Sequence, residues 1–236
     1  MDPASGDPRT VEIWISTQRS ETFTLGQSRI GGAPDLPKGT AWPRHRWPRS
    51  ETLAWPDYAR EDLANAIAGG EVVEELDHVA LALPFIAQLD LADLRPFDPR
   101  FARGGQLWLF ADQQTTLGEI GGYPYQASAC LYAERAELER VTPPPTPETL
   151  PALALTFATA TGEQPAPRHA VWPEVHEGVI GDVPPAGYQG LLRVDSDYTL
   201  DHVINWGDAA WITFAIPPQA FADGRFDEVR AFRFCG

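Results

Sequence analysis

Four aspartates in two parts of the sequence could carry chemistry: Asp90, Asp195, Asp197 and Asp208. One residue separates Asp195 from Asp197, so both side chains would lie on one face of a strand. Carboxylates that share a face could bind Ca²⁺ or Mg²⁺, or raise one another's pKa for acid–base catalysis. Alternatively, Asp195 and Asp208 accept backbone N–H bonds and fix the loops around Trp206. The further oxygen ligands and the glycine of a calcium loop are missing, so we predict no metal and no cofactor.

The segment 42–49 is a basic and aromatic patch in an acidic chain, and it contains Arg44, Arg46 and Trp47. Arg and Trp are enriched among the residues that dominate binding energy, and Arg also stacks on bases and aromatic rings. We therefore hypothesise that these three side chains contact a partner. The alternative is that the arginines pair with the protein's own carboxylates while the tryptophans pack inward.

The remaining reactive residues form no recognised catalytic motif. The histidines do not occur as His-Glu-x-x-His and no Cys-x-x-Cys accompanies them, although His202 could pair with a carboxylate of the acidic cluster. Gly31 and Gly32 could bind an anion through their amides, but the phosphate-loop patterns are absent. We expect these glycines to supply the positive φ of a tight turn. Cys130 and Cys235 are far apart in the sequence and are expected to be reduced thiols.

The net charge of the chain favours some classes of binding partner over others. The 236 residues carry 33 carboxylates against 18 Lys and Arg, a formal net charge of -15. Nucleic-acid binding needs clustered cations and is therefore disfavoured by this net charge, whereas an acidic surface can steer a basic protein towards it. No run of about 18 apolar residues is present to span a bilayer, and the N-terminal segment lacks the features of a signal peptide. We expect a cytoplasmic protein.

Apolar–polar periodicity predicts the elements that must position these residues. Strands are expected at 11–15, 22–25, 85–89, 106–111, 128–132, 153–159, 190–194, 211–216 and 230–234. Helices are expected at 56–67, 72–83 and 218–222. The Pro- and Gly-rich segment 31–48 is expected to be a fixed loop, and 142–147 an extended connector.

The two halves of the chain share a pattern. Each places an apolar strand before an aspartate, at 85–90 and 191–195, and then a strand of bulky apolar residues, at 107–110 and 211–216. A duplication would produce this pattern, but apolar strands that end in Asp are also common. We predict an α+β fold, mostly antiparallel β, in which two related sheets with peripheral helices form a single domain over residues 1–236.

A set of short motifs resembles the YwqG-like family of bacterial proteins. The motifs are Ile30-Gly31-Gly32 with Pro34 and Pro37, Trp42-Pro43, Phe85 to Asp90, Gly105 to Phe110, Leu192 to Asp197, Trp206-Gly207-Asp208, and Asp227 to Phe234. The resemblance implies an α+β fold, no established enzymatic activity and no catalytic residues to assign. Some relatives are thought to be immunity proteins against bacterial toxins. In the family Trp-Pro is followed soon by the strand at 85–90, whereas here residues 44–83 intervene as an insertion with two expected helices.

These observations favour a noncatalytic binding protein, an immunity-type inhibitor whose partner is a basic toxin domain. The anchors would lie on the insertion 44–83 or on acidic loops. The alternative is an enzyme, or a protein that binds a small ligand or metal, with Asp90, Asp195 and Asp208 in a cleft between the halves. A third hypothesis is a scaffold that binds through Arg44, Arg46 and Trp47.

Overall fold

The computed structural model describes residues 12–53, 55, 57–70, 72–112, 127–145, 149–162, 169–173, 180–181, 184–199, 204–206 and 210–235. Its main feature is an eleven-stranded antiparallel sheet in the order β13-β16-β15-β14-β12-β1-β11-β2-β7-β8-β9. The strands are β1 (Ile13–Arg19), β2 (Arg29–Ile30), β7 (Phe85–Asp90), β8 (Gln106–Ala111), β9 (Ser128–Ala133), β11 (Leu153–Thr159), β12 (Ala170–Val171), β13 (Ile180–Gly181), β14 (Gln189–Asp195), β15 (Ala210–Ile216) and β16 (Arg230–Cys235).

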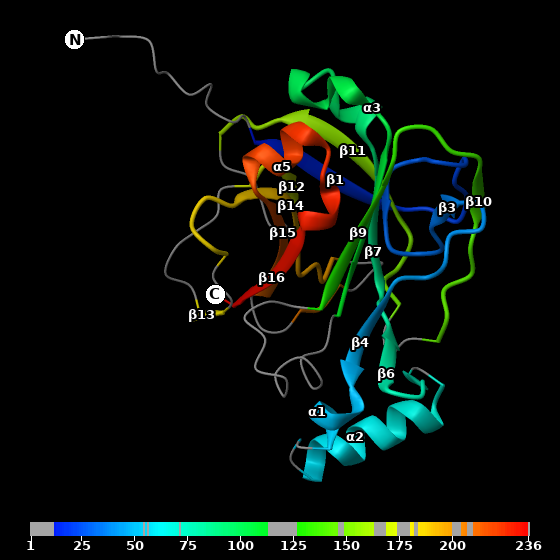
Figure 1. Cartoon of the computed structure of the whole chain (residues 1–236). Coiled ribbons are helices and arrows are strands. Elements are labelled where there is room, and N and C mark those ends of the chain that lie inside the picture. The colour runs from blue at the N-terminus through cyan, green and yellow to red at the C-terminus, as the bar shows by residue number, and fades with distance from the viewer. Residues whose placement is uncertain are drawn as a thin grey trace.

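The sheet curls into a nearly closed barrel of the ten strands from β16 to β9 (Figure 1). The N–H of Ala231 in β16 donates a hydrogen bond to the Ser128 Oγ of β9, at 3.1 Å. This bond joins the two sides of the opening. Barrel closure protects most strand edges from pairing with other chains.

The halves of the chain follow the same order within this sheet. A two-residue strand, β2 or β12, leads into three strands that pair in succession, β7-β8-β9 or β14-β15-β16. Between the halves β1 pairs with β11 over seven residue pairs, from Ile13 opposite Thr159 to Arg19 opposite Leu153. Because this ladder is continuous, the protein has one large sheet here where two related sheets were expected.

The strands β7 and β8 are buried on both faces. Leu89 and Leu107 face the barrel core, whereas Phe85, Trp108 and Phe110 belong to a second cluster outside it. That outer cluster includes Leu36 of the two-stranded sheet formed by β3 (Asp35–Pro37) and β10 (Leu138–Arg140). Burial of both faces explains why 85–89 reads as an almost continuous apolar run.

Residues 44–83 form an arm that extends from the barrel (Figure 1). It consists of a three-stranded sheet in the order β4-β6-β5 and two helices. Its elements are β4 (Arg44–Pro48), α1 (Arg49–Thr52), α2 (Asp57–Ala68), β5 (Val72–Glu74) and β6 (His78–Ala82). The arm has its own apolar cluster, which contains Trp47, Trp55, Leu63, Val72, Val79 and Leu81.

The structure of residues 31–83 corrects two expectations and confirms one. The helix expected at 56–67 is present as α2, but the helix expected at 72–83 is wrong, because that segment forms the hairpin of β5 and β6. Segment 31–48 is not only a loop, since it contains β3 and β4.

Short helices lie at the end of the barrel opposite the arm (Figure 1). They are α3 (Leu91–Leu94), η1 (Pro99–Arg103), α5 (Pro218–Asp223) and η2 (Phe226–Glu228). The expected helix at 218–222 is thus confirmed, whereas 22–25 forms no strand. The connector at 142–147 is described only to residue 145, where it has no regular structure. Within the described part of the chain, no helix is both long and apolar enough to cross a membrane.

Candidate functional site

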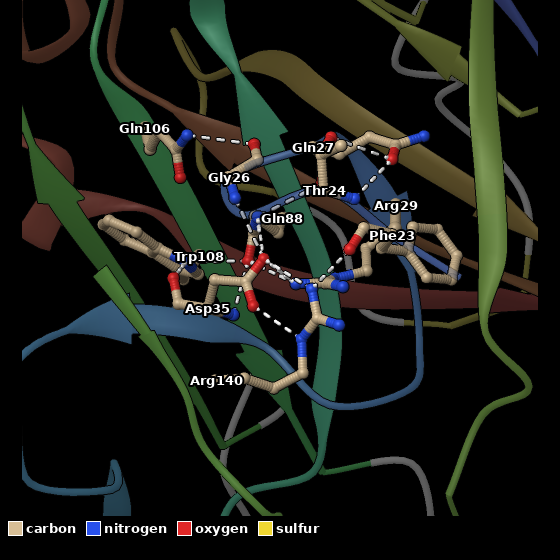
Figure 2. A network of polar contacts seen from close by, with 10 residues as sticks. All are labelled: Phe23, Thr24, Gly26, Gln27, Arg29, Asp35, Gln88, Gln106, Trp108 and Arg140. Atoms are coloured by element: carbon tan, nitrogen blue, oxygen red, sulfur yellow. Dashed lines mark hydrogen bonds and ion pairs between the residues drawn. The ribbon is translucent and has the colours of Figure 1, made fainter. Parts of the chain in front are cut away.

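Gln88 and Trp108, from two motifs of the first half, belong to a buried polar network centred on Asp35 (Figure 2). Asp35 is fully buried and forms an ion pair with Arg29, which is also buried. Arg140 of β10 donates from Nε to Asp35 Oδ1 at 2.8 Å, and the N–H of Gly26 donates to Oδ2 at 2.9 Å. One carboxylate therefore joins β2, β3, β10 and the loop before β2.

Gln88 and Trp108 connect this network to the barrel (Figure 2). Gln88 Oε1 accepts from the Asp35 N–H at 2.8 Å and from Trp108 Nε1 at 3.1 Å. Trp108 Nε1 also donates to the Asp35 carbonyl at 2.7 Å. Gln88 Nε2 donates to the Gln27 carbonyl at 3.1 Å, so the side chain is bonded at both ends. The loop around Asp35 is held by side chains of β7 and β8.

The network contains one carboxylate and two guanidinium groups. Burial raises the pKa of Asp35, but hydrogen bonds from Arg140 and Gly26 and the charge of Arg29 outweigh it, so this pKa lies below its ordinary value. Burial lowers the pKa of Arg29, and the charge of Asp35 opposes that change. A carboxylate that accepts this many hydrogen bonds is a poor base. The network therefore holds the loop around Asp35 in place.

The structure does not bring Asp90 and Asp195 together. Asp90 ends β7 and Asp195 ends β14, and five antiparallel pairings separate these strands. An odd number of reversals makes the two strands run in opposite directions, so the two aspartates lie at opposite ends of the barrel. Asp208 lies outside the described residues. The expected carboxylate cleft between the halves is therefore not formed by Asp90 and Asp195.

Each of these aspartates has a local role. Asp90 Oδ1 accepts from the Ala92 N–H at 2.9 Å and caps α3, and burial raises its pKa above the ordinary value. Asp195 Oδ1 accepts from Arg193 Nη2 at 3.1 Å. Asp197 Oδ1 accepts from the Thr199 N–H at 2.8 Å. Asp90 and Asp197 thus accept local backbone N–H bonds, the role that the structural alternative gave to Asp195 and Asp208, whereas Asp195 accepts from a side chain.

His169, which the sequence did not single out, lies beside Asp195 and Asp197. Its Nδ1 accepts from the Asp195 N–H at 3.0 Å, and its Nε2 lies 3.8 Å from Asp197 Oδ2. Both the His169 and Asp197 side chains are buried. His202, the histidine considered for this role, lies outside the described residues. Among the residues that the structure describes, no three His, Cys, Asp or Glu converge as a metal site.

The basic and aromatic segment becomes β4, whose residues alternate between two environments. Trp47 is fully buried in the arm, so the hypothesis that it anchors a partner is wrong. Arg46 pairs with Glu75 at 3.2 Å and Arg49 with Glu74 at 2.9 Å, both within the arm. Arg44 is exposed and forms no ion pair with any described residue. Period-2 alternation of a strand explains this pattern, with Arg44 and Arg46 outward and Trp47 inward.

The arm instead exposes aliphatic side chains. Leu53 is 71% exposed, Val73 43% and Leu76 90%. The N–H of Arg49 at the start of α1 donates to the Asp77 carbonyl at 3.0 Å, and its Nε donates to the Glu75 carbonyl at 3.1 Å. Leu53 and Leu76 therefore project from adjoining segments. Of the five large exposed apolar residues in the described part of the chain, three belong to the arm.

The sequence contained signals for two of these features. Gln88 is a polar residue inside an apolar strand, and a buried amide requires partners. The alternation of residues 44–47 predicts a strand with Trp47 inward. Asp35 and Arg140 are far apart in the sequence, and only the pairing of β3 with β10 brings them together.

One family model matches the chain: Domain of unknown function (DUF1963), over residues 28–166. The matched segment contains the arm and the network residues Arg29, Asp35, Gln88, Trp108 and Arg140, and it ends before β12. No curated protein matches the sequence.

Proposed function

Because the chain belongs to the DUF1963 family, a family of unknown function, we propose a function from its geometry: a noncatalytic protein that binds another protein through the arm 44–83. The observation that carries the proposal is the exposure of Leu53, Val73 and Leu76 on one small projecting unit. A contiguous patch of exposed aliphatic side chains marks a protein interaction surface, and Leu53 and Leu76, which project from adjoining segments, would form its centre.

The contrast between the barrel and the arm supports this proposal. The Asp35 carboxylate is occupied by Arg29 and Arg140, and Asp90 and Asp195 lie at opposite ends of the barrel. The arm has an apolar cluster separate from that of the barrel, so its surface can vary without loss of the barrel core. A rigid scaffold that presents a variable element is a common arrangement for binding proteins.

The partner that fits this surface is a basic protein. Residues 44–83 contain eight carboxylates and four arginines, and the whole chain has a net charge of -15. Three of the arginines pair with carboxylates of the arm itself. An acidic surface speeds association with a basic partner, while buried aliphatic anchors supply affinity.

The resemblance to YwqG-like proteins suggests a more specific class of partner. Some of those relatives are thought to be immunity proteins, so we propose that this protein inhibits a bacterial toxin with a basic domain. The mode of inhibition would be steric, since the proposal assigns no catalytic residue to this chain.

The test is a binding measurement between the purified protein and the product of the neighbouring gene. We expect a dissociation constant below about 1 μM, a favourable free energy of more than about 8 kcal/mol. The association rate should fall as salt is raised, because salt screens charge steering. The inhibition proposal is wrong if no neighbouring product binds below about 1 μM. Complex formation without loss of toxin activity would support binding and contradict inhibition.

A further inference from the structure

A pocket lies between the two halves at the barrel end opposite the arm. Its volume is about 260 Å³. Leu91 begins α3 and Gln189 begins β14, while Phe221 and Phe226 belong to α5 and η2. Because both halves contribute, the pocket exists only in the assembled barrel.

Aromatic packing gives this pocket a firm wall. Phe221 contacts Phe226 edge-on, with ring centroids 5.6 Å apart. On its other side Phe221 packs against Trp172 at 4.8 Å and Phe101 at 5.6 Å. Rings that are held in this way present fixed apolar surface to a ligand.

Two arginines line the same pocket, and only one of them forms an ion pair with a described residue. Arg100 is paired with Asp98, with Nε 2.9 Å from Oδ2, and its guanidinium lies 4.2 Å from the Trp172 ring centroid. Arg103 donates from Nη2 to the Ala222 carbonyl at 3.0 Å and forms no ion pair with any described residue. Without such an ion pair the Arg103 guanidinium can bind an anion, although its charge also acts on the exposed Asp223 carboxyl, whose pKa is lowered by a hydrogen bond from Arg225 and also by the charge of Arg103.

The backbone of α5 makes room for Arg103. Gly224 ends the helix with a left-handed φ of 76°. A Cβ at this position would lie 1.5 Å from Arg103 Nη1, so a side chain here would displace the guanidinium. The nearby Asp223 is bonded to Arg225 and Gln219, at 3.1 and 2.8 Å.

We propose that this pocket binds a small alkyl carboxylate. The alkyl chain packs against Leu91, Phe221 and Phe226, and the carboxylate accepts hydrogen bonds from Arg103. A guanidinium at the edge of an apolar pocket suits a ligand with one anionic and one apolar end, since Arg donates to carboxylates in a fixed fork.

Calorimetric titration with butanoate, hexanoate and octanoate tests the proposal. Each added methylene should strengthen binding about fourfold until the pocket is filled, as expected for burial of one CH₂. 1-Octanol is the neutral comparison and should bind at least roughly tenfold more weakly than octanoate. No binding of octanoate at millimolar concentration overturns the proposal, and equal affinity for octanol overturns the role assigned to Arg103.

Substitutions in the pocket test whether octanoate binds there. Ala222→Trp should fill the pocket and abolish octanoate binding, and Arg103→Met should weaken it at least roughly tenfold. Arg103→Lys keeps the positive charge and should restore part of the affinity. Arg46→Met on the arm is the matched control and should bind as the wild type does. Octanoate binding that survives Ala222→Trp would place the ligand elsewhere and contradict the proposal.

Discussion

Gly31 and Trp172 occupy equivalent positions in the two halves of the barrel, and both have a left-handed backbone, with φ of 63° and 55°. Each follows a two-residue strand, β2 or β12. The N–H of Gly31 donates to the Ile86 carbonyl at 2.9 Å, and that of Trp172 donates to the Leu191 carbonyl at 3.2 Å. The same turn is thus made once by a glycine and once by a tryptophan whose buried ring packs on Phe101 and Phe221.

Gly31→Ala should destabilise the protein more than Gly39→Ala does. Both glycines have positive φ, at 63° and 78°, so alanine is strained at either position. A Cβ at position 31 would lie 2.3 Å from the Pro151 carbonyl oxygen, whereas one at position 39 would meet no atom within 4 Å. We expect Gly39→Ala to cost about 1–2 kcal/mol of unfolding free energy and Gly31→Ala to exceed this. Urea denaturation measures both, and equal losses would contradict the close approach at Gly31.

Asp35→Asn should destabilise the fold by about 3–5 kcal/mol, because it leaves the buried Arg29 without a counter-charge. Asp57→Asn is the matched control, since Asp57 also pairs with an arginine but its side chain is 95% exposed. The control should have little effect on unfolding by urea. A small effect of Asp35→Asn would mean that the network does not hold the fold.

The Asp35 network should also leave a signature in the pH dependence of stability. The pKa of Asp35 is lowered in the folded state, so its contribution is complete above the unfolded value of about 3.9 and is lost as pH falls through the folded pKa. The gap in unfolding free energy between wild type and Asp35→Asn should therefore narrow from about pH 5 to pH 2. A gap that stays constant over this range would show that the charge of Asp35 does not contribute.

The sequence predicts the barrel better than it predicts the arm. Strands such as 85–89 and 153–159 are apolar or alternating over their whole length, and the structure confirms them. The apolar residues at 72, 76, 79 and 83 have helical spacing, yet Val72 pairs with Leu81 and Leu76 lies in the turn between β5 and β6. Pairing with β4 decides that structure, and a local pattern contains no information about it.

For the candidate site, the sequence identifies noteworthy residues, but it does not predict which of them lie close together in the structure. Asp90 and Asp195 follow the same local pattern, and for that reason they occupy equivalent positions at opposite ends of the barrel. Equivalent partners hold them: the Asp90 N–H donates to Ser28 Oγ at 2.8 Å and the Asp195 N–H donates to His169 Nδ1 at 3.0 Å. Contacts between distant segments cannot be inferred from spacing along the chain.

Trp47→Ala should unfold the arm and leave the barrel intact. Trp47 is fully buried among Trp55, Leu63 and Val79, and its truncation should cost the arm about 3–5 kcal/mol. Hydrogen exchange should accelerate in β4, β5 and β6 and stay unchanged in β15 and β16. Trp211→Ala on the barrel is the control and should leave exchange in the arm unchanged. Faster exchange throughout the barrel after Trp47→Ala would contradict the independence of the two cores.

The affinity of a Leu53→Ser/Leu76→Ser double variant for the product of the neighbouring gene tests the proposed role of the arm most directly. Leu53 and Leu76 are 71% and 90% exposed, so their substitution should leave the unfolding free energy almost unchanged. Leu25→Ser is the matched control, because Leu25 is 59% exposed and lies outside the arm. We predict that the double variant binds the partner at least about tenfold more weakly than wild type and that Leu25→Ser binds normally. Undiminished affinity of the double variant would contradict the claim that the arm is the binding surface.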